Sequence, residues 1–195
     1  MSMETHINTT CKSALFHLRN LSRIRKYLST KSTEILVHAF ITSKIDFCNA
    51  ILYGAPEHLL QKLQSVQNCA ARLVSLKSKY DHITPVLKEL HWLPVEYRIE
   101  FKILLVTYKC LNNLAPHYLQ ELINVYTPER QLRSLSKNYL EAATYNLRSY
   151  GYKAFSVSAP RLWNSLPDDL RNYKNISFDT FKSQLKTHLF IKAFY

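Results

Sequence analysis

The chain has 195 residues, with 26 Lys or Arg against 14 Asp or Glu, so its formal net charge is +12. This length can bury a real core, and a hydrophobic content of 47% argues against disorder throughout. The positive excess favours polyanions as partners, with nucleic acid ahead of an anionic membrane, although solubility alone would also explain it.

Glycine and cysteine usage excludes several kinds of site. Gly54 and Gly151 are the only glycines, so neither a P-loop nor a Rossmann phosphate turn can be built. The four widely spaced cysteines include no Cys-x-x-Cys pair, which excludes zinc ribbons and thioredoxin-like sites. We expect reduced, mostly buried thiols in an intracellular, soluble protein of the nucleus or cytoplasm, because no secretory signal or long apolar segment is seen.

The first predicted helix runs from about Ile7 to Leu28, with apolar residues on one face. The opposite face carries cations at i, i+7, i+11 and i+14, with an aromatic ring among them. This stripe suits a phosphate backbone, and two lysines of a later basic connector join it as candidates. An ordinary solvated helix face is the alternative. The candidate nucleic-acid-binding residues are Lys12, Phe16, Arg19, Arg23, Lys26, Lys77 and Lys79.

Two further helices follow in chain order. The second is predicted from about Ser32 to Leu52, with a bend, and ends at Gly54 in a C′ position. Pro56 is placed as the first residue of the third helix. That helix is strongly amphipathic, since apolar residues recur at helical spacing: Leu59, Leu63, Val66, Ala70 and Leu73.

The centre of the chain is predicted as a pair of helices joined by a proline elbow. Thr84 is a favourable N-cap and Pro85 a favourable first residue for a short helix. The elbow at 92–94, Trp-Leu-Pro, separates it from a helix that starts at Val95 and is apolar on most of its circumference. Such a helix belongs inside a domain, and Pro116 begins one more short helix.

The last third is less regular. Between Tyr126 and about Ser149 we predict a long basic loop, with residues 138–142 as its best extended piece. A helix then ends at Pro160, an aromatic-anchored turn covers 162–167, and Ser177 caps the final helix. The predicted fold is mainly α, with a bundle-like module at 1–80, a helical hairpin region packed on it at 81–127, and a small mixed or irregular subdomain at 128–195.

Tests for catalytic chemistry are negative. Asp168 and Asp169 are the only adjacent carboxylates, and after Pro167 they fit the first turn of a helix better than a metal site. No two of the eight histidines have the spacing of a His-Glu-x-x-His motif. Neither Cys48 nor Cys110 has a histidine at a spacing that signals a nucleophile pair. We expect no catalytic residue, no metal and no cofactor, and a cryptic Cys–His enzyme is the least favoured hypothesis.

Several phrases carry a resemblance: KIDFCN at 44–49, LQSVQNCAARLV at 63–74, the stretch 82–109, AFSVSAPRLWNSLP at 154–167, and the closing helix at 181–190. Together they resemble the C-terminal region, after the palm, of LINE-type, jockey-like non-LTR retrotransposon reverse transcriptases. The resemblance covers the chain from about residue 12. It implies that 1–80 is thumb-like and that 128–195 is a post-thumb region.

The resemblance also limits what we expect. The endonuclease, the fingers and the palm with its aromatic-x-Asp-Asp motif are missing, so the chain looks like a non-catalytic fragment of an RNA-directed DNA polymerase. A thumb holds the primer–template, which implies binding to an RNA–DNA or DNA duplex, with no membrane partner. The alternative is a protein–protein interaction or self-association module without a nucleic-acid role, formed through helices that the missing palm leaves exposed.

Overall fold

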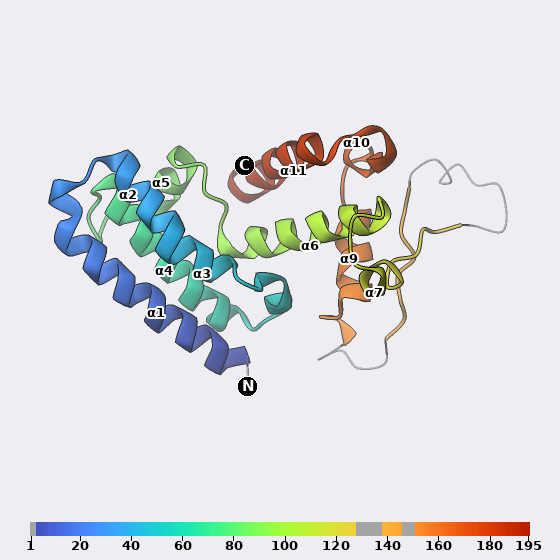
Figure 1. Ribbon diagram of the computed structural model, residues 1–195, viewed down its shortest axis with the longest axis horizontal. Helices are drawn as coiled ribbons and strands as arrows, with labels where there is room; N and C mark the ends of the chain where they lie inside the picture. The colour runs from blue at the N-terminus through green and yellow to red at the C-terminus, as the bar shows by residue number, and fades with distance from the viewer. Residues whose placement is uncertain (1–2, 128–137, 146–150) are drawn as a thin grey trace. The chain divides into compact units, whose positions relative to one another are not determined.

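The computed structural model describes residues 3–127, 138–145 and 151–195. It confirms the predicted mainly α class (Figure 1). The stretches 128–137 and 146–150, on which much of the predicted basic loop falls, lie outside the described residues. The α-helices are α1 Met3–Ile24, α2 Thr30–Val37, α3 Ser43–Asp46, α4 Glu57–Ser75, α5 Ile83–Glu89, α6 Val95–Leu111, α7 His117–Gln120, α9 Phe155–Asn164, α10 Asp168–Arg171 and α11 Phe178–Phe194.

The chain forms two compact units. Unit 1 comprises Met1–Ile99 with Lys192–Tyr195, and unit 2 comprises Glu100–Ile191. The boundary between the two units falls inside α6. The division into the segments 1–80, 81–127 and 128–195 stays a prediction. Among the described residues, no helix combines the length and the apolarity that a membrane crossing requires.

The core of unit 1 is built where α1 and α4 lie side by side (Figure 1). Both helices are amphipathic, as predicted, and each turns its apolar stripe toward the other. Every leucine buried in this way stabilises the unit by roughly 1.5–3 kcal/mol relative to an exposed one. The buried residues of this pair are Ile7, Ala14, Leu18 and Leu21 on α1, and Leu59, Leu63, Val66, Ala70 and Val74 on α4.

The predicted bent helix is three consecutive pieces. After α2, a π-helical segment, His38–Thr42, leads into α3. The helix stops earlier than predicted because Cys48 has a left-handed backbone (φ 53°), and a short 3₁₀ turn follows. Arg98 on α6 fastens the end of α3, since its Nε lies 2.8 Å from one carboxylate oxygen of Asp46 and its Nη2 contacts the other. Gly54 has the predicted positive φ, 67°.

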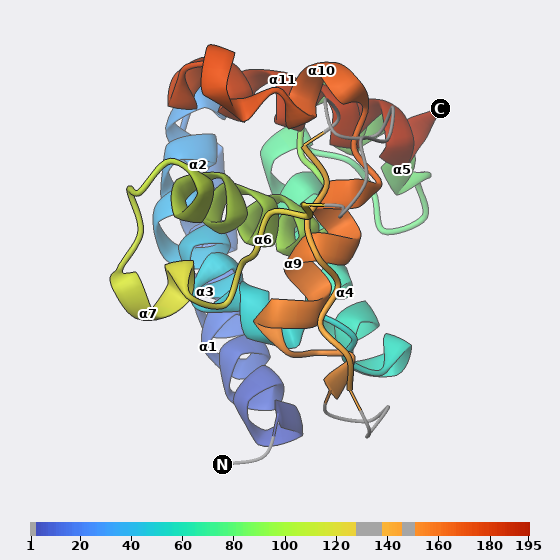
Figure 2. The same ribbon diagram turned by 90° about the vertical axis from the view of Figure 1, so that its right-hand side faces the viewer.

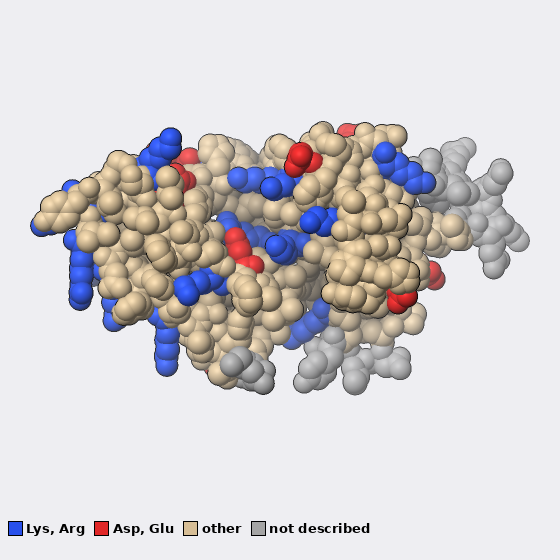
Figure 3. All heavy atoms as spheres, in the orientation of Figure 1, with Lys and Arg blue, Asp and Glu red and all other residues tan. Residues whose placement is uncertain are grey.

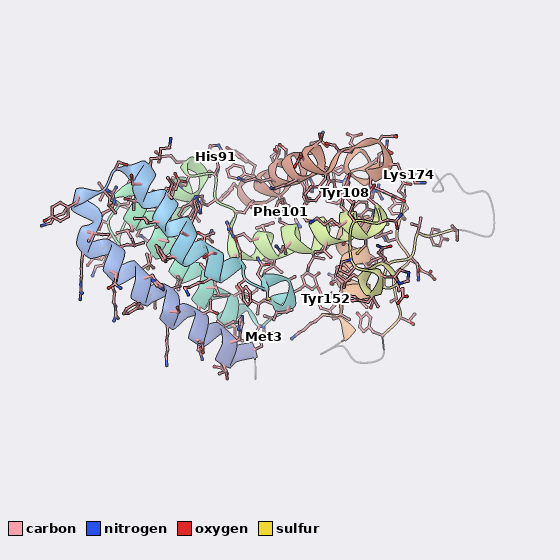
Figure 4. The ribbon with its side chains drawn as sticks, in the orientation of Figure 1. Met3, His91, Phe101, Tyr108, Tyr152 and Lys174 are labelled. Carbon is pink, nitrogen blue, oxygen red and sulfur yellow. The ribbon has the colours of Figure 1, made fainter. Side chains whose placement is uncertain are left out.

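The elbow between α5 and α6 is held by polar side chains of α4. The Gln67 amide donates to the carbonyl oxygen of Leu93 over 2.8 Å, and Gln64 Oε1 accepts from the backbone N–H of Val95 at 2.9 Å. The turn also needs a left-handed residue, His91 (φ 55°), which Figure 4 labels at this place. Amide side chains on an otherwise apolar helix face therefore satisfy backbone groups that the elbow leaves unpaired.

Four predicted helix starts in unit 1 differ from the structure: α1 begins at Met3 rather than near Ile7, α2 begins at Thr30 rather than near Ser32, and the starts of α5 and α4 also shift. Helix α5 begins at Ile83 with His82 as its N-cap, so Thr84 is not the cap. Pro85 still lies in the first turn, where its missing N–H costs no hydrogen bond. Pro56 is the N-cap of α4 rather than its first residue.

Unit 2 is organised around buried aromatic rings. Trp163 and Phe181 are completely buried, with ring centroids 5.8 Å apart. Tyr108 of α6, labelled in Figure 4, stacks on Phe181 at 4.4 Å, and burial raises the pKa of its hydroxyl. The final helix is capped by Ser177, as predicted, through a 3.2 Å hydrogen bond from the Thr180 amide.

The predicted end of a helix at Pro160 is wrong. Helix α9 runs through Pro160 to Asn164, so Trp163 is helical rather than part of a turn. Pro160 is the sixth residue of α9, so the helix loses the hydrogen bond that an N–H at this place in its second turn would make. Burial of the Trp163 indole outweighs that loss.

Residues 138–145 run beside α9 (Figure 2). The Asn164 side chain donates to the carbonyl oxygen of Leu140 at 2.9 Å and accepts from its N–H at 2.8 Å. Leu140 also pairs with Val125 in an isolated antiparallel bridge, whereas Asn138 has a left-handed backbone (φ 49°), so the predicted extended piece 138–142 is borne out only around Leu140. The indole N–H of Trp163 donates to the Asn138 carbonyl oxygen at 3.0 Å.

Candidate nucleic-acid interface

A groove of about 850 Å³ runs between α1 and the C-terminal half of α4, entirely within unit 1. Four leucines belong to its lining: Leu15, Leu18, Leu73 and Leu76. Six cationic side chains line it among the described residues: Arg19, Arg23, Arg25, Lys26, Arg72 and Lys77.

The sequence places these side chains through helical spacing. Ser22 and Arg23 follow Arg19 by three and four residues, so they share the flank of α1 next to its buried stripe, and Arg25 and Lys26 come from the 3₁₀ turn Arg25–Tyr27 that follows the helix. Cys69, Arg72 and Leu73 stand three and four residues apart and share one flank of α4, and Leu76 is its left-handed C-cap. When the two buried stripes pack, these flanks become opposite walls of one groove.

Arg25 is the structural member of the set. It is only 8% exposed, and its guanidinium donates to the carbonyl oxygens of Leu73 (2.9 Å), Val74 (3.0 Å) and Leu28 (2.8 Å). Leu73 and Val74 lie in the last turn of α4, where carbonyl groups lack helical partners and a cation also complements the helix dipole. Arg25 therefore closes one end of the groove and holds its walls together.

The remaining cations are available to a ligand. Arg19, Arg23, Lys26 and Lys77 are exposed. Arg72 makes one long hydrogen bond, 3.3 Å from Nη2 to the carbonyl oxygen of Asp81, while its buried Nε has no partner in the described part of the chain. No carboxylate lines the groove in the part that the structure describes, so its positive potential is not neutralised locally. Figure 3 shows a run of Lys and Arg along the edge formed by α1.

The structure brings together four of the seven predicted residues. Arg19, Arg23, Lys26 and Lys77 line the groove, whereas Lys12 and Lys79 are exposed outside it. Phe16 is 61% exposed and also lies outside the groove, in edge-to-face contact with His17 at 5.5 Å.

Sequence reasoning missed Arg25, Arg72 and Cys69. Arg25 falls on the buried side of the predicted first helix, and the sequence alone does not show that its guanidinium binds backbone carbonyl groups. Arg72 and Cys69 stand three residues apart on one flank of an amphipathic helix, but spacing alone does not show that this flank packs beside α1.

The prediction that most thiols are buried is wrong for two of the four cysteines. Cys69 is exposed in the groove and Cys48 is exposed outside it, whereas Cys110 is buried. Burial raises the pKa of the Cys110 thiol. It also raises that of Cys11, against the opposing charge of Lys62. The exposed thiols are therefore the accessible ones.

The acidic pair 168–169 lies where a helix dipole favours it, in the first turn of α10. Asp168 contacts Nη2 of the buried Arg171, whose guanidinium also covers the ring of Tyr139 at 4.1 Å. Within the described ranges, no group of three or more His, Cys, Asp or Glu is placed to hold a metal ion.

No family model, no curated protein and no solved structure matches this chain. The groove and its charges are therefore the observations from which its function is argued.

Proposed function

We propose that the chain binds nucleic acid through the α1–α4 groove, and that it is a non-catalytic C-terminal piece of a retrotransposon-derived reverse transcriptase that retains primer–template binding. The observation that carries the proposal is the gathering of five cations beside the structural Arg25, with no acidic residue among the described lining, in one groove of unit 1. Phosphate groups supply most of the affinity in protein–nucleic acid complexes, and they require this kind of surface.

The spacing of the cations suits a polymer rather than a single anion. Arg19 and Arg23 are one helical turn apart, about 5–6 Å along α1, and a nucleic-acid strand presents a phosphate about every 3.4 Å along its axis. A strand that follows the groove therefore offers one or two phosphates for each turn of α1. The leucines of the groove lining accept sugar faces between them.

The resemblance supports the same surface. The phrase LQSVQNCAARLV forms the part of α4 that carries Cys69, Arg72 and Leu73, so the phrase forms one wall of the groove. In the resembled enzymes the corresponding helices belong to a thumb, and a thumb holds an RNA–DNA or DNA duplex. A nucleic-acid ligand would place the chain in the nucleus or cytoplasm.

The proposal assigns the chain no polymerase activity of its own. The aromatic-x-Asp-Asp motif of a palm is not in the sequence. The one adjacent acidic pair, Asp168–Asp169, is in the first turn of α10, with Asp168 bound to Arg171.

The test is charge reversal in the groove. Arg19→Glu/Arg23→Glu should weaken binding of a labelled RNA–DNA hybrid by about tenfold or more at moderate salt, because two phosphate contacts become repulsions. Lys182→Glu/Lys186→Glu is the matched control, since it changes the net charge equally through exposed residues of α11. Equal affinities for the two variants in fluorescence anisotropy would contradict the proposal.

Self-association is the second candidate, and exposed apolar side chains of unit 1 favour it. Ile35, Phe47 and Ile51 are each about 60% exposed or more, and exposed apolar side chains form an association site where they are contiguous. Under this candidate the chain forms oligomers in light scattering, and Phe47→Asp/Ile51→Asp separates them into monomers. A monodisperse wild-type monomer would exclude self-association and leave nucleic-acid binding untouched.

A further inference from the structure

Three rings form a contiguous surface on unit 1, outside the groove. His17 is the middle member. It meets Phe16 edge to face at 5.5 Å and stacks on Phe40 at 5.3 Å with an interplanar angle of 21°. The two phenylalanines are 61% and 43% exposed. We call this set the ring cluster.

One member of the ring cluster, Phe40, lies in the π-helical segment His38–Thr42. Phe40 stands between two buried residues, Val37 before it and Ile41 after it, yet it is exposed, and its ring meets His17 of α1. Such π segments are rare and are frequent at functional sites.

The ring cluster adjoins the cation stripe. Phe16 stands four residues after Lys12 and three before Arg19, so all three share one face of α1. A ligand that contacts the ring cluster thus lies beside exposed positive charge. An apolar protein partner would have to desolvate those cations, whereas a polyanion would be attracted by them.

We propose that Phe16, His17 and Phe40 are a stacking surface for the bases of a single-stranded nucleic acid whose phosphates lie on the neighbouring cations of α1. The inference rests on the proposed function and extends it, because it adds a single-stranded segment to the duplex that the groove is proposed to bind. The bases of a duplex are stacked inside it, so they cannot stack on exposed aromatic side chains. The bases of a single strand can do so while cations next to the rings bind its phosphates.

The experiment compares three ligands on the full chain: a single-stranded oligonucleotide, an abasic oligomer with the same backbone and length, and a duplex. The wild-type chain should bind the single strand about tenfold or more tightly than the abasic oligomer, because base stacking is then the only difference between them. In Phe16→Leu/Phe40→Leu that preference should disappear, while affinity for the abasic oligomer stays unchanged.

Phe47→Leu is the matched control, because it makes the same change at an exposed phenylalanine outside the ring cluster, and it should keep the preference. Phe16→Trp should keep it as well, which separates stacking from a loss of fold. Quenching of a 2-aminopurine base in the single strand gives a second readout, expected with wild type and lost in the double leucine variant.

The outcomes separate the two proposals. If the wild-type chain binds single-stranded and abasic oligomers equally, or if the double leucine variant keeps the preference, the stacking inference is wrong while phosphate binding in the groove stands. If Arg19→Glu/Arg23→Glu binds all three ligands as the wild type does, the proposed function itself fails.

Discussion

Arg25 shows how one residue connects the fold to the groove. Its buried guanidinium satisfies carbonyl oxygens of Leu28, Leu73 and Val74, so the charge is used for structure rather than for a ligand. A hydrogen bond to a charged group contributes roughly 1.5–3 kcal/mol. The neighbouring Arg23 differs, since it is exposed and lines the groove.

We therefore expect Arg25→Ala to lower the free energy of unfolding by about 2 kcal/mol or more. Arg23→Ala is the control and should change it by about 0.5 kcal/mol or less, as is usual for an exposed position. Urea denaturation measures both. Equal stabilities of the two variants would show that the contacts of Arg25 do not hold α4 to α1.

The cysteines provide reporters at residue scale. Because the thiolate is the reactive form, the raised pKa values of Cys11 and Cys110 leave less thiolate at neutral pH. Alkylation of these two should be slower than that of Cys48 and Cys69, and should reach its full rate only at higher pH. Because the pKa of each of these two thiols is raised, the folded state favours the neutral thiol. This contribution to stability is fully present below the ordinary thiol pKa and is lost as the pH rises through the raised pKa. Peptide mass spectrometry with pH-stepped alkylation measures the order.

Bound nucleic acid should protect one of the two exposed thiols. Cys69 lines the groove and Cys48 does not, so we expect slower alkylation of Cys69 only. Protection of both thiols, or of neither, at saturating ligand would argue against the groove as the binding surface.

At the scale of elements, Asn164 takes the place of a neighbouring strand. Its carboxamide pairs with both backbone groups of Leu140, which joins the 138–145 segment to α9. Asn164→Leu removes both hydrogen bonds and takes these partners away from the backbone N–H and carbonyl oxygen of the buried Leu140. We expect a loss of about 1–3 kcal/mol in stability and faster hydrogen exchange at the Leu140 amide.

Asn175→Ala is the matched control, because the Asn175 side chain makes one exposed hydrogen bond, to Asn172. It should leave the Leu140 exchange rate unchanged. If Asn164→Leu also leaves it unchanged, the bridge to Val125 holds the segment without help from α9.

Much of the helical architecture could be predicted, because amphipathic spacing is local information. The stripe of α1 and the buried stripe of α4 both follow from it. Pro160 shows where local rules fail, since a proline that stops a helix in isolation is accepted when Trp163, one turn later, is buried in the core of unit 2. Helix propensity is a weak prior against tertiary packing of this kind.

The candidate groove could be predicted only in part. Its α1 wall is visible as a cation stripe, whereas its α4 wall depends on which flank of α4 packs beside α1. Spacing alone does not give that register. Arg72 was therefore unrecognised, and Lys12 and Lys79 were included although they lie outside the groove. Phe40, which contacts His17, lies in a π segment, for which the sequence offers no simple signal.

On the scale of the whole molecule, the +12 charge becomes informative through its distribution. Five cations that are not used for structure, Arg19, Arg23, Lys26, Arg72 and Lys77, converge on one groove. Each phosphate contact releases counterions, so the affinity for nucleic acid must fall steeply with salt. If the charges served solubility alone, reversing two of them in the groove would change this salt dependence no more than reversing two elsewhere on the surface.

The measurement that tests the groove most directly is therefore the salt dependence of binding, with log Kobs plotted against log salt for the wild type and Arg19→Glu/Arg23→Glu. Five contacts predict a wild-type slope of about −3.5 to −4.5, and the variant should be shallower by about 1.4–1.8. Lys182→Glu/Lys186→Glu should keep the wild-type slope. A slope that is the same in all three proteins would contradict the assignment of the groove as the nucleic-acid interface.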